Sequence, residues 1–337
     1  VCYTCVRECP AKAIRIADGQ AQVIPERCIG CGNCVRVCSQ NAKQVMDGKT
    51  RTAQLVDGRD HVAAIVAPSF PAEFTECSHR QMVGMLKQAG FDSVHEVAFG
   101  ADLVARAYRR LLAEDQDSRY VATSCPAIVG YVERYVPSLL PTLAPVVSPM
   151  IAMARVIRQL HGDGVRGAFI GPCIAKKGEA SYPGLAGEVD VSLTFSEMRE
   201  FLEQRGITPA DAPREDFDPP HAGPGALFPI SRGLLQAADI KEDLMTGQVV
   251  ATDGRTNFVE AIRGFENGTL DARLLEVLCC NGCIMGAGMT CQAPKFMRRR
   301  QVSDYARSCW ENRSREQWEK NIEQFKDLDL TRHYTAD

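Results

Sequence analysis

A run of four cysteines near the N-terminus constrains this chain more than any other feature. The run has the spacing C-x2-C-x2-C-x3-C and consists of Cys28, Cys31, Cys34 and Cys38. Bacterial ferredoxins have this spacing, with thiolates that bind 4Fe-4S clusters and a fourth cysteine that serves the other cluster of a pair. Thiolates suit iron because they are soft, anionic donors. We therefore expect this segment to fold around iron-sulfur clusters and to transfer single electrons.

A second, incomplete run precedes the first. It contains Cys2, Cys5 and Cys9, and its missing first cysteine is expected just before Val1, as if the chain were truncated there. The crossed pattern of two-cluster ferredoxins gives two ligand sets. The first 4Fe-4S cluster would be held by Cys2, Cys5 and Cys38. The second would be held by Cys9, Cys28, Cys31 and Cys34. A pair of zinc sites is the alternative, although zinc more often uses paired C-x-x-C knuckles. Short strands around Ile14 and Val23 are expected to flank the clusters.

Composition excludes several other classes of protein. A net charge of -3 gives no basic surface for nucleic acid. The 337 residues, 45% of them hydrophobic, are enough for two or three domains with ordinary cores. Fifteen cysteines would suit a disulfide scaffold in a short secreted chain, but this chain is long and shows no signal peptide. Metal ligation is the better interpretation, and a cytoplasmic location is expected.

Residues 136–154 are uncharged and largely apolar, as a membrane span would be. Prolines recur at every fourth position, however, at Pro137, Pro141, Pro145 and Pro149. Each would remove a helix hydrogen bond and clash with the preceding turn, so no membrane span is expected. A buried, extended connection followed by a helix from about Met150 fits better.

After about Asp57, apolar runs alternate with amphipathic stretches, which is typical of an α/β fold. The predicted strands are residues 61–68, 91–99, 119–125, 165–173 and 271–279. The predicted helices include residues 78–90 and 101–115. Ser78 is the expected N-cap of the first helix, and Gly90 its stop.

Three cysteines follow predicted strands: Cys125, Cys173 and Cys279. Ligands of parallel α/β sheets bind outside the carboxyl ends of the strands, so these thiols are expected to converge. Cys283 lies one short loop after Cys279 and would supply a fourth thiolate for an iron-sulfur cubane. Ordinary buried cysteines are the alternative.

Three segments resemble, in order, the cluster-binding segments of the FeFe-hydrogenase family, and the likeness covers nearly the whole chain. They are "TSCPA" at 123–127, "GPCIAKKGE" at 171–179 and "CCNGCIMGAG" at 279–288. The resemblance implies that Cys125, Cys173, Cys279 and Cys283 bind the cubane of an H-cluster. Cys283 would also bridge to a two-iron subsite with carbonyl, cyanide and azadithiolate ligands. The implied partners are dihydrogen, protons, a redox or signalling protein, and the maturation enzymes of the subsite.

The resemblance also implies the domain organisation. Residues 1–57 would form the two-cluster ferredoxin domain. Residues 58–300 would form an α/β H-cluster domain, with two lobes at about 58–145 and 146–300 whose parallel sheets surround a central cluster. Residues 301–337 would form a C-terminal helical extension.

Further residues match positions around the two-iron subsite. Lys176 matches a lysine that holds one cyanide, and Pro68 with Ser69 matches the segment that donates to the other. Phe228 matches an aromatic wall, and Glu179 a carboxylate on the proton route. The alternatives are a solvated lysine for Lys176, a plain core phenylalanine for Phe228 and a surface salt bridge for Glu179.

Departures from the family are equally informative. Active members carry a proton-relaying cysteine where this chain has Ser124, and a hydroxyl is a far weaker acid than a thiol. Family methionines are replaced by Gly171 and by Val277 or Leu278. These changes resemble the sensory groups of the family and predict slow turnover. The rival prediction is a non-catalytic protein of the cytosolic cluster-assembly type, which lacks the two-iron subsite.

The remaining features have simpler expectations. Cys280 is an alternative proton-relay thiol, and Arg298–Arg300 is expected to be a solvated face or a docking patch. The expected structural thiols are Cys77, Cys291 and Cys309.

Overall fold

The computed structural model describes residues 2–334. The N-terminal segment contains a hairpin of β1 (Ile14–Ala17) and β2 (Gln20–Val23), with Ile14 opposite Val23. Asp18 and Gly19 form its two-residue turn, and both have positive φ, as this type of tight turn requires. The short helices α1 (Thr4–Arg7) and α2 (Asn33–Arg36) carry cysteines of the two runs. The expected short strands are thus confirmed.

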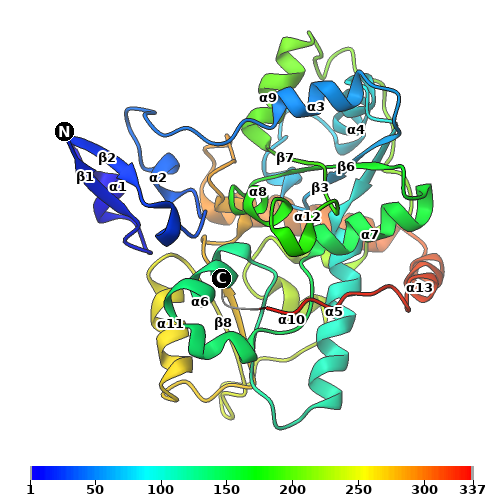
Figure 1. The fold of residues 1–337 in the computed structure, drawn as a ribbon. Coiled ribbons are helices and arrows are strands. Elements are labelled where there is room, and N and C mark those ends of the chain that lie inside the picture. Colours follow the sequence, from blue (N-terminus) through cyan, green and yellow to red (C-terminus); the bar gives the residue numbers. More distant parts are fainter. Residues whose placement is uncertain (1, 335–337) are drawn as a thin grey trace.

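The larger part contains two separate parallel sheets. The order of the first is β4 (Ser93–Glu96), β3 (Val62–Val66), β6 (Arg166–Gly171) and β7 (Val191–Thr194). The order of the second is β5 (Tyr120–Val121), β9 (Leu274–Leu278) and β8 (Val249–Asp253). Every pairing within these two sheets is parallel. Figure 1 shows the first sheet above β8, with the blue N-terminal segment beside them. The predicted α/β fold with parallel sheets is confirmed.

Buried strands and amphipathic helices explain this arrangement. All residues of β3 and β9 are buried, as parallel strands covered on both faces require. The long helices of the larger part include α4 (His79–Gln88), α5 (Val97–Glu114), α6 (Pro126–Tyr135), α7 (Pro149–His161), α9 (Phe195–Gln204) and α11 (Asn257–Glu266). Ser78 caps α4 through a capping box with Gln81, as predicted. Gly100 lets α5 approach α7 closely, because a Cβ there would lie 2.5 Å from Pro149 O.

Three local predictions were wrong in extent. The strand expected at 91–99 ends at Glu96, and α5 begins at Val97. The strand expected at 119–125 is only Tyr120–Val121, because the chain then turns toward α6. The proline-rich connection is buried in part but contains a 3-10 helix, Pro137–Thr142, instead of being fully extended.

The predicted division of the lobes at about residue 145 is also wrong. The first sheet combines strands from 62–96 with strands from 166–194, and the second combines β5 with β8 and β9. Long-range strand pairing therefore interleaves the two lobes in sequence. No helix within residues 2–334 has the length and apolar character needed to cross a membrane.

The edges of the larger part differ from the predicted boundaries as well. The boundary at 300 falls inside α12 (Lys295–Asn312), which is followed by α13 (Arg315–Gln324). The helix α3 (Lys49–Val56) buries Leu55 in the core of the first sheet, so this packing begins before residue 57. The remaining helices are α8 (Ala175–Ala180) and α10 (Gly233–Ala237), with 3-10 turns at Pro25–Arg27, Phe70–Ala72, Pro183–Leu185, Pro224–Leu227 and Cys283–Met285.

Candidate metal centre

The four cysteines expected to converge line one enclosed cavity between the two sheets. Cys125 is the N-cap of α6, just after β5. Cys173 follows β6 from the other sheet, and Cys279 follows β9 directly. Cys283 begins the 3-10 turn after Cys279. Because the carboxyl ends of strands from both sheets meet here, four thiols from three distant segments share one pocket.

Burial raises the pKa of three of these thiols above the ordinary value for cysteine. Burial raises the pKa of Cys125 and raises that of Cys283 well above its ordinary value. Burial and the neighbouring Cys125 thiol raise the pKa of Cys173 to about 12. Buried thiols of this kind stay protonated until a metal supplies the positive charge that favours the thiolate. The donor set therefore fits an iron-sulfur cluster.

Glycines bring the third cysteine segment onto the second. A Cβ at Gly286 would lie 2.5 Å from Pro172 O, and one at Gly288 would lie 2.7 Å from the Cβ of Thr194. Gly288 N also donates to Pro172 O at 2.8 Å. Only residues without a side chain allow so close an approach, so the glycine cluster positions Cys283 against the Cys173 loop.

Arg298 fixes the far side of the same segment. Its guanidinium donates to Ile284 O at 2.9 Å, to Ala293 O at 2.7 Å and to Cys291 O. The side chain is buried, so the expectation that Arg298 belongs to a solvated face was wrong. Its neighbours Arg299 and Arg300 are exposed, as expected.

A second cavity, of about 70 Å³, adjoins the first and shares Cys173 and Cys283 with it. Three polar residues predicted from the sequence line it: Ser69, Ser124 and Lys176. Both serine hydroxyls are buried without a hydrogen-bond partner. Since buried polar groups are nearly always satisfied, these donors fit an occupant that carries acceptor atoms.

The rest of this second cavity is apolar. Pro68 and Phe228 line it, together with Met150, Phe169 and Leu278. Val277 and Leu278 were the two candidates for the residue that replaces a family methionine. Leu278 lines this cavity, and Val277 is not among its lining residues. An acceptor group held here would have few polar contacts other than the two hydroxyls and Lys176.

Lys176 and Glu179 form a buried ion pair on α8. Lys176 Nζ lies 2.6 Å from Glu179 Oε2, and the residues are 8% and 4% exposed. The readings as a solvated lysine and a surface salt bridge were therefore wrong. Ser148 Oγ donates to Glu179 Oε2 at 3.0 Å, and Arg332 donates to Oε1 at 3.2 Å. Sequence reasoning missed Ser148 and Arg332, because no motif marks either residue.

In the N-terminal segment, part of the second predicted ligand set lies together. Burial, and then the charges of Cys31 and Cys28, raise the pKa of Cys34 to about 11. Burial raises the pKa of Cys28, to which neighbouring Cys31 and Cys9 also contribute. Backbone N–H groups donate to two of these sulfurs, Ala13 N to Cys9 at 3.3 Å and Gly30 N to Cys28 at 3.4 Å. Such N–H···S bonds are one of the means by which proteins tune iron-sulfur clusters.

The other predicted set has separate local settings. Cys2 is exposed, Cys5 is buried in α1, and Cys38 Sγ accepts a hydrogen bond from Ala42 N at 3.3 Å. Their sharing of a cluster stays a prediction. Among the expected structural thiols, Cys77 and Cys291 are partly buried and Cys309 is buried in α12.

Cys31 and Cys280 also line the central cavity. A hydrogen bond from the Cys279 thiol lowers the pKa of Cys31 to about 7. Cys279 likewise lowers the pKa of Cys280, and the charges of Arg255 and Arg36 act in the same direction. Cys280 lines this cavity but is not among the residues that line the second cavity, which does not support its alternative role as a relay thiol.

Within the described residues, no three His, Cys, Asp or Glu side chains are close enough to share a single metal ion. In a cubane, by contrast, each of the four thiolates can bind a different iron, so its ligands stand farther apart.

Comparison with known proteins places this geometry in a family. Residues 60–287 match the family described as "Iron only hydrogenase large subunit, C-terminal domain", and residues 1–39 match the "4Fe-4S dicluster domain". Iron hydrogenase 1 of Clostridium pasteurianum is 22% identical over 296 residues, 71% of this chain and 52% of that protein. The NADP-reducing hydrogenase subunit HndD of Solidesulfovibrio fructosivorans is 24% identical over 262 residues, 62% of this chain and 45% of that protein. This chain thus spans about half the length of these curated relatives.

Solved structures share the fold. An FeFe-hydrogenase structure concerned with oxygen inactivation of the H cluster has a TM-score of 0.68 at 19% identity, covering 86% of this chain and 99% of that one. HydA1 of Chlamydomonas reinhardtii, in a variant form, has a TM-score of 0.65 at 18% identity, with the same coverage. The family match covers more than half of this sequence. The chain therefore belongs to the iron-only hydrogenase large-subunit family.

Proposed function

We propose that this chain binds dihydrogen, or interconverts it slowly with protons and electrons, at an H-cluster between its two sheets. Its biological role would be sensory or regulatory. The observation that carries the proposal is the second cavity, where two unpartnered hydroxyls and Lys176 face an otherwise apolar space beside Cys173 and Cys283.

In this proposal, the cubane is held by Cys125, Cys173, Cys279 and Cys283. Cys283 would also hold the two-iron subsite, which is consistent with its place in the walls of both cavities. When bound, the H-cluster would supply the redox chemistry of dihydrogen.

The protein's own contribution would be to orient the subsite and exclude water. Lys176 would donate to one cyanide, and the Ser69 hydroxyl to the other, while Pro68 from the same segment lines the cavity beside it. A charged donor in a dry pocket forms a strong hydrogen bond, so these contacts would fix the subsite. Phe228 and Leu278 would close the apolar wall.

Two residues support slow turnover. Ser124 would stand where a proton relay is needed, yet a hydroxyl exchanges protons far less readily than a thiol of pKa near 8.5. Glu179, proposed for the proton route, has both oxygens engaged by Lys176, Ser148 and Arg332. Proton transfer through Glu179 would require one of these contacts to open.

The pocket around Gly171 also supports slow turnover. A Cβ at Gly171 would lie 2.5 Å from the Phe169 ring, which itself lines the second cavity. A larger side chain at this position would need the ring to move, so the pocket differs from that of members with methionine here. This difference favours a specialised role over fast catalysis.

Electrons would pass through two N-terminal 4Fe-4S clusters to a redox or signalling protein. Cys31 and Cys279 line the same cavity, which supports a short route between the second cluster and the cubane. The proposed location is the cytoplasm, whose reducing conditions keep cysteine thiols available as cluster ligands.

Isotope exchange tests this proposal. The chain, matured with the family's maturation enzymes, should form HD from D2 in ordinary water at a slow but measurable rate. The same chain made without those enzymes is the matched control and should form none. Absence of exchange at full two-iron occupancy would contradict the proposal. Failure to take up the two-iron subsite would favour the cluster-assembly alternative.

A further inference from the structure

The two proposed cluster regions meet at a junction of three sulfurs. Cys31 from the N-terminal segment lines the same cavity as Cys279 and Cys280, which follow β9. In the proposed function, Cys31 belongs to the second ferredoxin cluster and Cys279 to the cubane. An electron passing between these clusters would therefore cross this junction.

The N-terminus of α11 lies against the same junction. Gly254, between β8 and α11, donates through its N–H to Leu278 O at 3.1 Å and to Cys280 O at 3.2 Å. Gly254 has φ +106, and a Cβ there would lie 2.6 Å from Asn281 Oδ1. The glycine thus allows close contact between the segment that precedes α11 and the third cysteine segment.

Arg255 adds a full positive charge at this point. Its Nε and one terminal nitrogen are buried and have no hydrogen-bond partner. Its charge acts on the thiols of both Cys31 and Cys280. Two buried N–H donors without an acceptor are costly, and cluster-bound thiolates and sulfides are suitable acceptors.

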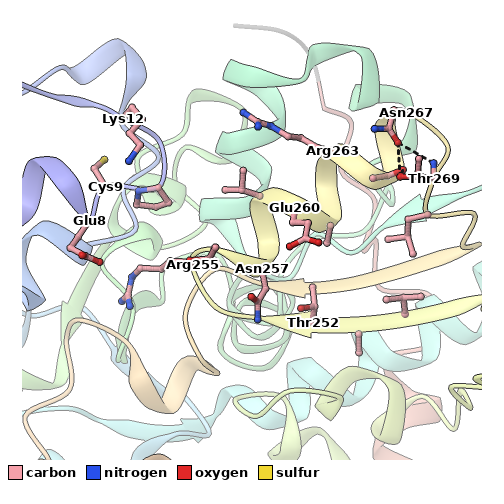
Figure 2. Close-up of a pocket in the computed structure, with 18 of the residues that line it drawn as sticks. Glu8, Cys9, Lys12, Thr252, Arg255, Asn257, Glu260, Arg263, Asn267 and Thr269 are labelled. Atoms are coloured by element: carbon pink, nitrogen blue, oxygen red, sulfur yellow. Dashed lines mark hydrogen bonds between the residues drawn. The ribbon is translucent and has the colours of Figure 1, made fainter.

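The surroundings of Arg255 belong to both parts of the chain. The residue lines a cavity of about 940 Å³ between the N-terminal segment and α11, together with Glu8 and Cys9. Figure 2 shows the Arg255 side chain reaching from the start of α11 toward Glu8 and the N-terminal segment. Arg36, on α2, is a second cation near Arg255 and Cys280.

We propose that Arg255 is a positioning residue for electron transfer. Its charged N–H groups would donate to the sulfurs of the cluster bound by Cys31 and so raise the reduction potential of that cluster. This inference rests on the proposed function only for the presence of the N-terminal clusters. Reduction adds one electron and hence one negative charge to the cluster, and no bond or proton changes. A nearby cation stabilises the reduced form more than the oxidised form. The cluster would then accept electrons readily at the entrance to the central site.

Redox titration monitored by electron paramagnetic resonance tests this role. The full chain, made without maturation enzymes, would be titrated as parent, Arg255→Gln, Arg255→Lys and Arg263→Gln. Arg263 lines the same cavity farther along α11, so its variant loses one charge in the same helix and serves as the matched control. At a fixed ambient potential, Arg255→Gln should lower the ratio of reduced to oxidised cluster about tenfold, which is about 59 mV for a one-electron couple.

The Lys variant keeps the charge but loses the planar fork, so its ratio should fall less than that of the Gln variant. Equal potentials in Arg255→Gln and Arg263→Gln, with cluster iron intact, would overturn the role of Arg255. If Arg255→Gln does not retain its cluster, the Lys variant decides, and a potential equal to that of the parent would overturn hydrogen bonding by Arg255. An N-terminal cluster signal missing from the parent protein would instead contradict the two-cluster proposal itself.

Discussion

Replacement of Ser124 by Cys should raise the rate of dihydrogen turnover. Ser124 lies directly before Cys125 and lines the second cavity beside Cys283. Its hydroxyl has no close hydrogen-bond partner, although the Tyr108 hydroxyl lies nearby, so the replacement removes little hydrogen bonding. Sulfur is only slightly larger than oxygen, and we expect the change to cost less than about 1.5 kcal/mol of folding free energy.

The size of the effect follows from proton transfer. A positioned acid or base typically contributes about 10²- to 10⁴-fold to a rate, and each tenfold step is about 1.36 kcal/mol of barrier. We expect about 10²-fold, at the lower end of this range. Glu179 keeps both oxygens engaged, and the Phe169 ring still fills the space at Gly171.

Hydrogen uptake and evolution would be measured for the parent, Ser124→Cys and Ser124→Ala after identical maturation. Rates would be normalised to two-iron occupancy from infrared band intensities. The Ala variant alters the same position without a transferable proton and should not gain activity. No gain in the Cys variant at equal occupancy would refute proton relay as the limiting factor and would leave the altered pocket as the explanation.

Three further predictions test other parts of the account. Cys173→Ala should lose the iron of the central site and keep the N-terminal clusters, whose proposed ligands lie within residues 2–38; unchanged total iron would show that Cys173 is not a ligand. Lys176→Ala should leave the cubane assembled but weaken retention of the two-iron subsite. If the variant has the same infrared bands and the same two-iron occupancy as the parent, Lys176 serves only in the ion pair with Glu179. Burial raises the pKa of Glu276 from an ordinary 4.5 to about 8, so the native state favours the protonated carboxyl. The contribution of the protonated Glu276 carboxyl to the free energy of unfolding should be complete below pH 4.5. It should be lost as the pH rises to about 8, a change on the order of a few kcal/mol. The free energy of unfolding would be measured by denaturation at pH 5 and pH 8. The stability of Glu276→Gln relative to the parent should be higher at pH 8 than at pH 5. An equal difference at both pH values would count against this prediction.

Local patterns predicted the individual elements well where the signal was unambiguous. The apolar run around β3 and the capping box at Ser78 appear as expected. The apolar run at 91–99 suits a strand and a helix equally. The sequence pattern therefore did not predict that β4 ends at Glu96 and that α5 begins at Val97. Strand order was likewise out of reach, because β5 pairs with β9 about 150 residues later in the chain.

For the site, cysteines at strand ends were enough to predict the convergence of Cys125, Cys173 and Cys279. The contribution of Arg332 could not be predicted, since it depends on a C-terminal segment that packs against Glu179 from 153 positions away. Arg255 was missed for a similar reason, because only the fold brings the start of α11 to the junction between Cys31 and Cys280.

An infrared spectrum of the matured protein tests the central claim most directly. Carbonyl and cyanide stretching bands should appear in the purified chain after maturation, and they should weaken in Lys176→Ala. Absence of these bands from a preparation that has passed through full maturation and retains its cubane iron would contradict an H-cluster in this cavity.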